Sequence, residues 1–459
     1  MRAKFKLVLL ALLVPAIFIY TVFPLRCEIR SPRIGAPAIL KAGAILPIAV
    51  KHSFPYGTGE WHFSLRPRFG QDIELTTSLQ LAGLSESQFS AQLPEHISPG
   101  AYSLLVRYGN RLKIAANALH VVEAFNRDLK IVQLADLPTL GNAKGDGQLI
   151  KIIDEINIIN PDLVLFTGDV AYGASWLQYG RLYQILQRVS APLILAPGNH
   201  EYYGWAGYLT SFGSPYHAVQ YGDYRIISLN SGHGRDQFTY SQLKWMKRQL
   251  EKSEQSQRIV QLHHPVHHRP DLGGYVRGNV RAFVSLIKQH KVSVVLSGHW
   301  HGDALYNENG DDVTDSWRVS GTPYIVTTTA GADFRPAYSS SPLHYGYRLL
   351  RYRDAELENY TYDYDGDGER DVSSSIPFNN LSVTQTAPYT FRVKNALNEG
   401  FKSAMVHLQI ADDGKHFCPS EGRVSTKVYG EKLSDYWISL DIPAQRELEI
   451  NMLNQGACP

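Results

Sequence analysis

The chain has 459 residues, of which 44% are hydrophobic and 19% are charged. This composition excludes an extended disordered protein, and the length exceeds that of one compact domain, so two or three folded domains are expected. The net charge of +2 gives no electrostatic reason to expect a nucleic acid or another polyanion as a partner.

The first 27 residues are predicted to act as a signal anchor or a signal peptide. Basic residues precede an uncharged apolar run from Leu7 to Leu25, which ends at Arg26. The run is near the lower length limit for a helix that spans a bilayer, and no small-residue cleavage motif follows it. These features favour an uncleaved membrane anchor over a removed signal peptide. Both interpretations place the rest of the chain outside the cytoplasm, as an anchored, periplasmic or secreted protein.

Residues 28–124 have the pattern of a β-sandwich without evident chemistry. The segment Tyr102–Tyr108 is typical of this region, because polar residues interrupt its apolar ones as in a half-buried strand. Turns rich in glycine, proline and serine separate such stretches, and no helical periodicity of useful length occurs. We therefore expect a domain built only from strands here.

Strands and helices alternate in residues 125–352. Apolar runs predict strands at Ile131–Ala135, Leu163–Thr167, Leu193–Ala196, Ile259–Leu262 and Val292–Leu296. Helical spacing predicts helices at Gly147–Asn160, Trp176–Ser190, Thr239–Leu250 and Val280–His290. Such alternation with apolar strands indicates a largely parallel sheet that is covered on both faces.

Residues 353–459 return to short alternating strands and turns, which predicts a β-rich C-terminal domain. This domain contains Cys418 and Cys458, for which we expect a disulfide in an oxidising compartment. Two unpaired thiols are the alternative.

An acidic segment near the start of the C-terminal domain resembles a calcium-binding loop. Carboxylates stand at alternate positions, namely Asp363, Asp365, Asp367, Glu369 and Asp371. Glycine occupies the sixth position, as in loops that wrap oxygen ligands around one hard cation. The twelfth position is Ser374 rather than a bidentate glutamate, so a solvated acidic turn is the alternative to a structural calcium site.

Five short polar segments each follow an apolar strand of residues 125–352. They read Ala-Asp-Leu-Pro from residue 135, Gly-Asp-Val-Ala-Tyr from 168, Gly-Asn-His-Glu from 198, His-His-Pro from 263 and Gly-His-Trp-His from 298. In open α/β sheets, sites form outside the carboxyl ends of the strands. One such segment alone would usually be a turn or a helix cap, but the full set brings aspartate, tyrosine, asparagine and histidine to one edge.

These residue types suit a pair of metal ions. Two cations about 3.5–4 Å apart clamp the attacking and leaving oxygens of a displacement at phosphorus. A carboxylate bridges such a pair, while imidazole and hard oxygen ligands suit iron, zinc and manganese. His299 and His301 alternate along an extended segment, so each can serve a different metal.

The order of these motifs over residues 128–332 resembles the calcineurin-like metallophosphoesterase superfamily. The resemblance implies a catalytic sandwich of two mixed sheets flanked by helices, an α/β (α+β) fold. It also implies a dinuclear metal centre that hydrolyses phosphate esters with a water activated at the metals. The N-terminal β domain is similar, at the level of pattern, to the fibronectin-like or immunoglobulin-like module of the larger purple acid phosphatases.

One departure from the superfamily pattern points to the purple acid phosphatases. Most members have Asp-x-His in the first segment, whereas this chain has Pro138 in place of the histidine. Tyr172 stands three residues after Asp169, as in purple acid phosphatases, where a tyrosinate replaces that histidine. A phenolate is a hard donor that favours Fe(III), with zinc, iron or manganese in the second site. Pro138 also differs from the glycine usual in that subfamily, so a backbone contact near Asp136 is expected to be lost.

The resemblance implies a ligand set for each metal. For the first metal it gives Asp136, Asp169, Tyr172 and His301. For the second metal it gives Asp169 as the bridge, with Asn199, His263 and His299.

Two histidines are catalytic candidates beside the metals. His200 follows the ligand Asn199, as the substrate-contacting histidine of the superfamily does, and is placed to protonate the leaving alkoxide. His267 lies shortly after the ligand His263 and is the second candidate, for which an ordinary surface imidazole is the alternative.

The sequence therefore predicts a metal-dependent hydrolase of phosphate esters, with an acid-phosphatase-like phosphomonoesterase as the leading interpretation. A phosphodiesterase on the same centre is the closest alternative, because both reactions use the same metals and pocket shape decides between them. A non-catalytic surface protein on a decayed phosphatase domain is the third, and only Pro138 favours it.

Overall fold

The computed structural model describes residues 27–52, 60–68, 70–83, 85–232, 237–252, 257–267, 274–315, 319–334, 344–364, 366–367, 374–411, 415, 417–428 and 433–454. The chain divides into two compact units. The first holds Leu40–Val122 together with the chain up to Arg33, and the second holds Ile34–Ile39 and Glu123–Pro459. The short strand β2 (Ala38–Leu40) lies at the boundary between them in the sequence.

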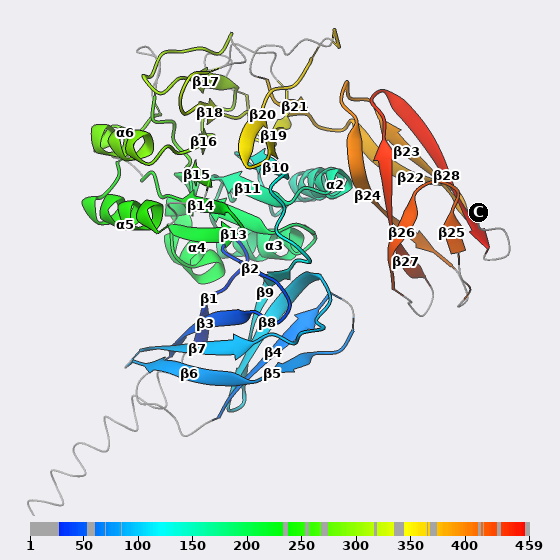
Figure 1. Cartoon of the computed structure of the whole chain (residues 1–459), viewed down its shortest axis with the longest axis horizontal. Helices are drawn as coiled ribbons and strands as arrows, with labels where there is room; N and C mark the ends of the chain where they lie inside the picture. The colour runs from blue at the N-terminus through cyan, green and yellow to red at the C-terminus, as the bar shows by residue number, and fades with distance from the viewer. Residues whose placement is uncertain are drawn as a thin grey trace, which may run out of the picture. The chain divides into compact units, whose positions relative to one another are not determined.

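The first unit is built from two antiparallel sheets (Figure 1). One sheet has the order β1 (Cys27–Ser31), β3 (Ile45–His52), β7 (Glu86–Gln92) and β6 (Thr77–Ala82). The other includes β9 (Arg111–Val121), β8 (Gly100–Tyr108), β4 (Trp61–Pro67) and β5 (Ile73–Leu75). Alternate residues of β3 are buried, as the pleat of a one-sided strand requires. Among the described residues of 28–124 the regular elements are all strands, so the predicted β-sandwich is confirmed there.

Two mixed six-stranded sheets form the centre of the second unit. The first has the order β12 (Leu193–Ala196), β11 (Leu163–Thr167), β10 (Leu129–Leu134), β19 (Gly346–Arg353) and β20 (Glu356–Asn359), and β21 (Ile376–Pro377) also pairs with β19. The second has the order β13 (His217–Tyr221), β14 (Tyr224–Ser228), β15 (Gln257–Gln261), β16 (Val294–Ser297), β18 (Tyr324–Val326) and β17 (Ala304–Tyr306). Neighbouring strands β10, β11 and β12 are parallel, as are β14, β15, β16 and β18.

The helices cover the outer faces of these two sheets. Helices α2 (Ala143–Ile159), α3 (Trp176–Leu186) and α4 (Trp205–Phe212) share one apolar core with β10–β12. Helices α5 (Tyr240–Glu251) and α6 (Val280–Gln289) share another with β14–β16, and Figure 1 shows them on the side of the strands opposite α2. The predicted sandwich of two mixed sheets flanked by helices is confirmed. As expected, the central strands of each sheet run parallel to one another. Strands β13, β17 and β19 instead pair antiparallel with their neighbours β14, β18 and β10.

Side chains at the helix starts explain where the helices begin. The Asn142 side chain accepts a hydrogen bond from the Gly145 amide at the start of α2, and Thr239 does the same for Gln242 at α5. Ser175 and Gln178 form a reciprocal capping box at α3. These caps set the direction in which the chain leaves the loops that follow β10 and β11.

The C-terminal strands form two further antiparallel sheets. One has the order β22 (Leu381–Ala387), β23 (Thr390–Asn395), β28 (Arg446–Asn454) and β25 (Phe417–Pro419), and the other β24 (Phe401–Ile410), β27 (Ser434–Ile442) and β26 (Arg423–Val428). Strand β24 lies beside α2, and both contribute to one apolar core (Figure 1). The predicted boundary after residue 352 falls inside the β19–β20 hairpin, because the first catalytic sheet continues to Asn359.

Three sequence predictions concern segments that the structure describes only in part. The predicted anchor over residues 7–25 lies outside the described residues, and no helix among those described is long and apolar enough to cross a membrane. In the predicted calcium loop, Asp363 accepts a hydrogen bond from the Gly366 amide, whereas Asp365, Glu369 and Asp371 lie outside the described residues. Cys418 is disulfide-bonded, and its predicted partner Cys458 also lies outside that part of the chain.

Candidate metal centre

Four of the predicted ligands have a left-handed backbone. The φ angle is 53° at Asp136, 51° at Asp169, 69° at His299 and 56° at His301. Residues other than glycine rarely adopt this conformation, and when they do they gather at functional sites. All four follow directly on β10, β11 or β16, so each chain turns sharply where its strand ends and directs a side chain inward.

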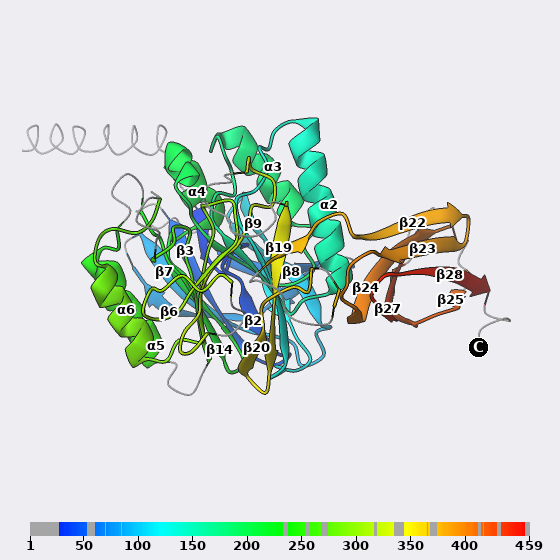
Figure 2. The same cartoon turned by 90° about the horizontal axis from the view of Figure 1, so that it is seen from above.

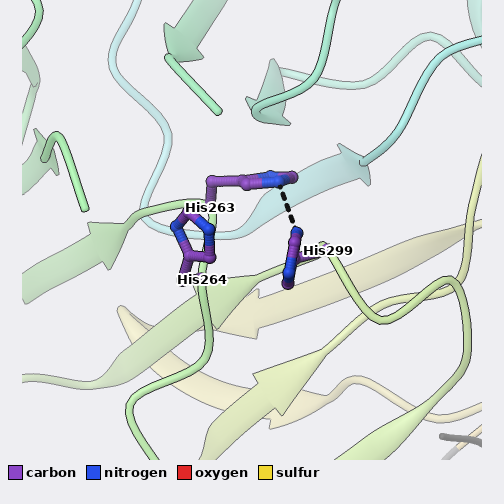
Figure 3. A group of neighbouring side chains, drawn as sticks. All are labelled: His263, His264 and His299. Carbon is purple, nitrogen blue, oxygen red and sulfur yellow. Dashed lines mark hydrogen bonds between the residues drawn. The ribbon is translucent and has the colours of Figure 1, made fainter. Parts of the chain in front are cut away.

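Four donor atoms, including its own Nε2, converge at the imidazole of His263. Its Nε2 lies 3.2 Å from Asp169 Oδ2, 3.2 Å from Asn199 Oδ1 and 3.1 Å from His299 Nδ1. The other ring nitrogen, Nδ1, lies 2.8 Å from the carbonyl oxygen of Thr167 and is fixed as its donor. Nε2 of His263 and these three neighbouring atoms belong to the residues predicted for the second metal, and a dashed line in Figure 3 joins the ring nitrogens of His263 and His299, whose rings are nearly perpendicular.

A second group of donors adjoins the first through Asp136. Its Oδ1 atom is buried without a hydrogen-bond partner, yet it lies 3.2 Å from His301 Nε2. Its Oδ2 atom accepts a hydrogen bond from the His299 amide at 2.8 Å. A buried carboxylate oxygen that faces imidazole nitrogens is the arrangement that a cation completes. Asp136, Asp169 and His263 lie close enough to hold one ion, so the residues fit a metal site.

The charges in this group support one another. Burial opposes ionisation of Asp169, but the charge and hydrogen bond of His263 hold the pKa of Asp169 below the usual carboxyl range. Burial likewise works against the His263 imidazolium, but Asp169 and Asp136 raise the pKa of His263 to about 9. The site therefore favours positive charge between the two carboxylates, and a bound cation supplies such charge in place of the proton.

Glu201 organises the loop that carries the bridging aspartate. Its buried carboxylate accepts hydrogen bonds from the amides of Asp169, Val170, Ala171 and Gly198. Burial, followed by the nearby charge of Asp169, raises the pKa of Glu201 to about 7. One side chain thus fixes the backbone turns after β11 and β12 relative to each other.

His200 lies at the edge of the centre, between two tyrosine rings. Its amide donates to Asp169 Oδ1 at 2.9 Å, and its Nε2 lies 3.8 Å from Asp169 Oδ2. Its Nδ1 lies 2.7 Å from the carbonyl oxygen of Tyr172, so Nε2 is the nitrogen available toward the centre. The Tyr172 ring stacks on His200 with centroids 4.1 Å apart and is 46% exposed. The role of Tyr172 as a ligand stays a prediction.

The structure places Pro138 and His267 differently from the ligands. Pro138 packs against the backbone of Gly331, where an added Cβ would lie only 2.8 Å from the proline ring. The contacts of Asp136 are nevertheless complete, because its amide donates to Gly168 and its carbonyl oxygen accepts from Ala332 and the Thr329 hydroxyl. The expected loss of a backbone contact is therefore not seen at Asp136.

His267 packs against aromatic rings instead of joining the ligands. Its ring lies 4.4 Å from that of Tyr324 and 6.0 Å from that of Tyr306. Tyr324 begins strand β18, whereas the ligands follow the carboxyl ends of the strands. Its neighbour His264 is closer to the chemistry, since it groups with His263 and His299 in Figure 3 and lies 2.8 Å from the hydroxyl of Ser231.

A buried ion pair supports the loop that carries His301. Asp303 Oδ1 accepts from Arg348 at 2.7 Å, and Asp303 Oδ2 accepts from the amide and hydroxyl of Ser375. Arg348 also donates to the Thr327 hydroxyl and the Tyr360 carbonyl oxygen. The loop after β16 is thereby joined to β19 and to the chain that precedes β21.

Sequence reasoning assigned no role to Glu201, His264 or Asp303. Glu201 had a local signal, because it completes the Gly-Asn-His-Glu run after an apolar strand. His264 was visible as the neighbour of a predicted ligand. Asp303 had no local sequence signal, because its partner Arg348 lies 45 residues away along the chain.

Comparison with known proteins agrees with this geometry. Residues 129–303 match the family described as calcineurin-like phosphoesterases. A probable cyclic nucleotide phosphodiesterase from Vesicomyosocius okutanii is 29% identical over 168 residues, 35% of this chain and 72% of that protein. One from Moraxella catarrhalis is 27% identical over 200 residues, 38% of this chain and 72% of that protein. Among solved structures, a purple acid phosphatase from yellow lupin seeds matches with a TM-score of 0.47 and 14% identity over 72% of each chain.

The fold, the buried aspartate and histidine donors and the family match define a hydrolase of phosphate esters that depends on metal ions. Residues 129–303 carry the calcineurin-like phosphoesterase match, and the buried donors of the metal centre lie within this part of the chain.

Proposed function

We propose that this chain hydrolyses phosphodiesters. The sequence motifs favoured a monoesterase, whereas the curated relatives favour the alternative considered with it. Two are named as probable cyclic nucleotide phosphodiesterases, and a third, from Arcobacter nitrofigilis, as a probable glycerophosphodiester phosphodiesterase. That third relative is 26% identical over 162 residues, 31% of this chain and 57% of that protein.

The charge around His200 carries the proposal from the side of the structure. The segments 170–180 and 202–222, which flank His200 in space and in sequence, contain no aspartate, glutamate, lysine or arginine. A phosphomonoester carries up to two negative charges near neutral pH, and proteins usually match the second with an arginine or lysine. A phosphodiester carries one. These two segments offer no cation for a second negative charge and therefore suit the diester, whose single charge bound metal ions would neutralise.

The residues of the centre have distinct roles in this proposal. Asp136, Asp169, Tyr172 and His301 would hold one metal ion, and Asp169, Asn199, His263 and His299 would hold the other. Bound ions would supply electrostatic stabilisation of the phosphoryl oxygens and would acidify the attacking water. As the water oxygen bonds to phosphorus, the water loses a proton to solvent, the bond from phosphorus to the leaving oxygen breaks, and protonated His200 donates a proton from Nε2 to that oxygen. Glu201 holds Asp169 and Asn199 in register by binding the backbone on both sides.

The proposal includes the cellular position. The apolar run from Leu7 to Leu25 anchors the chain, and the catalytic unit acts outside the cytoplasm. Protease added outside intact spheroplasts is expected to degrade the catalytic unit. Full protection would contradict this part of the proposal and leave the chemistry unaffected.

Two matched substrates test the chemistry. Bis(4-nitrophenyl) phosphate and 4-nitrophenyl phosphate release the same alcohol, so they differ only in the second ester group. For enzyme loaded with metal, we expect a higher kcat/KM for the diester and no hydrolysis of either after chelation. A higher value for the monoester would restore the monoesterase interpretation. Absence of hydrolysis with metal bound would indicate a non-catalytic protein.

A further inference from the structure

Four large side chains on the segments that follow β11 and β12 are exposed to solvent, and two of them, Tyr172 and Tyr203, contact His200. Tyr172 is 46% exposed, Trp176 64%, Leu177 73% and Tyr203 67%. We name this set the aromatic rim. Burial of large apolar side chains is the rule in folded proteins, so several exposed ones beside a catalytic site suggest a binding surface.

Contacts between two loops hold the aromatic rim together. An added Cβ at Gly204 would lie 1.7 Å from the carbonyl oxygen of Ala174, so the backbones of the two loops touch. Trp176 and Leu177 follow Ala174 at the start of α3, and Tyr203 precedes Gly204 in the 3-10 helix η1 (His200–Gly204). Helices α3 and α4, which continue these loops, also pack together, as Figure 2 shows.

His200 connects the aromatic rim to the reaction. The Tyr172 ring lies parallel to the His200 ring, and the edge of the Tyr203 ring meets it with centroids 5.5 Å apart. Because His200 protonates the leaving oxygen in the proposed function, the organic group on that oxygen must lie next to His200. Tyr203, whose ring contacts His200, is then the first surface that this group meets, and Trp176 lies on the adjoining segment that touches Gly204 through Ala174.

We propose that the aromatic rim binds a flat, uncharged aromatic group carried by the alcohol that leaves. This inference rests on the proposed function and names the class of substrate. Three of the four rim residues are aromatic, and aromatic faces bind flat rings by stacking, as they bind nucleobases. The absence of charged residues from segments 170–180 and 202–222 disfavours a sugar phosphate or a polyphosphate on that side.

Three dialkyl phosphates test the inference with unactivated alkoxide leaving groups, and the change of their kcat/KM ratio in the variants cancels the remaining difference in basicity. Dibenzyl phosphate presents a flat ring, bis(cyclohexylmethyl) phosphate presents an apolar group of similar size that is not flat, and dimethyl phosphate presents neither. We expect kcat/KM for the benzyl ester to exceed that for the cyclohexylmethyl ester by about tenfold, as stacking of one ring allows. Alcohol release is measured by chromatography for enzyme with its metals bound.

Variants of Tyr203 identify the surface. Its side chain is mostly exposed, so replacement leaves the core intact. Tyr203→Leu keeps an apolar side chain but removes the ring, and should reduce the benzyl preference about tenfold. Tyr203→Phe keeps the ring and should retain the preference for the benzyl ester. Trp176→Leu removes a different ring of the rim and should also reduce this preference, which tests the surface independently of Tyr203.

Each outcome has a separate meaning. Equal kcat/KM for the benzyl and cyclohexylmethyl esters, both above dimethyl phosphate, would show an apolar or acyl-chain site and overturn the aromatic assignment. A preference unchanged in both Tyr203→Leu and Trp176→Leu would place the ring elsewhere and overturn the rim. Hydrolysis of none of the three esters, or of bis(4-nitrophenyl) phosphate, would instead contradict the proposed function.

Discussion

We use the name ligand loops for the segments after β10, β11, β12, β15 and β16 that carry the predicted metal ligands. The ligand loops and the aromatic rim are adjacent at Tyr172 and His200, yet they differ in burial, charge and backbone conformation. The ligand loops are buried, charged and held in left-handed conformations, each of which costs about 1–2 kcal/mol for a residue other than glycine. The rim is exposed, uncharged and in ordinary helical or loop backbone. The buried donors of the first region are fixed by backbone turns and hydrogen bonds. The second can change its side chains without disturbing the fold, so chemistry and choice of substrate are separable here.

Removal of a ligand should have the largest effect. His263→Ala deletes the imidazole at which four donors converge, and should lower metal affinity and activity by more than roughly 100-fold. Metal content by mass spectrometry and hydrolysis of bis(4-nitrophenyl) phosphate measure this. His407→Ala is the matched control, because His407 lies exposed on β24 and pairs with Asp435. Full activity in His263→Ala would break the separation between the two regions.

Replacement of His200, where the two regions meet, should affect the rate but not the metals. His200→Ala should lower kcat by roughly 10²–10⁴-fold for alkyl esters, because the leaving alkoxide then departs without a proton. The loss should shrink for 4-nitrophenyl esters, whose leaving group needs none. An equal loss for both esters would mean that His200 binds substrate rather than donating a proton.

Glu201 tests whether the geometry of the ligand loops depends on one support. Glu201→Gln replaces one acceptor oxygen with an amide donor that faces backbone amides, and should weaken metal binding by roughly 10–100-fold. The preference for benzyl over cyclohexylmethyl esters should persist, because the rim is unchanged. Glu251→Gln, at the end of α5, serves as control. A loss of the ester preference along with the metal would show that the two regions are coupled.

Tyr172 belongs to both regions by position, and its hydroxyl decides which one it serves. With a tyrosinate on Fe(III), the oxidised protein should be purple or pink, and Tyr172→Phe should remove the visible band while it leaves the second metal in place. The ring, and so its stack on His200, remains. A colourless protein that contains Fe(III) would assign Tyr172 to the rim alone.

The smallest effect on activity is expected at a buried carboxyl group, that of Glu155, which is remote from both regions and affects stability instead. Glu155 on α2 accepts a hydrogen bond from the Asn379 amide, and burial raises the pKa of Glu155 from 4.5 to about 8. A raised carboxyl pKa means that the folded state binds the extra proton between these values. Its contribution to stability is therefore complete below pH 4.5 and is lost as the pH rises through about 8.

Glu155→Gln should remove this dependence. The difference in urea midpoint between the variant and the wild type should change in favour of the variant as the pH rises from 4.5 to 8, with activity ratios unaffected. A difference that is constant across this range would contradict the assignment.

The ligand loops were largely predictable from the sequence because each follows a strand whose apolar run is unmistakable. The strand Leu163–Thr167 was predicted with its observed bounds, and the polar segments that follow such strands meet where parallel strands end. The four predicted helices match α2, α3, α5 and α6 to within a few residues, although α2 begins at Ala143 rather than Gly147, because the Asn142 cap adds a turn without apolar spacing. Helix α4 (Trp205–Phe212) was not predicted.

The features that were not predicted depend on pairs far apart in the chain. Strand β19 pairs with β10 across more than 200 residues, and no local pattern in Gly346–Arg353 indicates that partner. The amides bound by Glu201 and the partner of Asp303 likewise follow only from the assembled sheets. The solvent exposure of Trp176 and Tyr203 could not be predicted from the sequence either, because an aromatic residue near a strand usually packs in the hydrophobic core.

The Asp303–Arg348 pair bears on how far the catalytic part can be cut out of the chain. The family match ends at residue 303, at the very side chain that Arg348 and Ser375 hold from the far side of that limit. A chain truncated after Asp303 would retain every predicted ligand but lose strand β19 from the first sheet and leave a buried carboxylate without its cation, an arrangement that destabilises strongly. The smallest fragment that can fold with an intact metal centre is therefore longer than the segment matched by the family. A fragment made for transfer of the activity has to extend at least through Pro377, the end of β21.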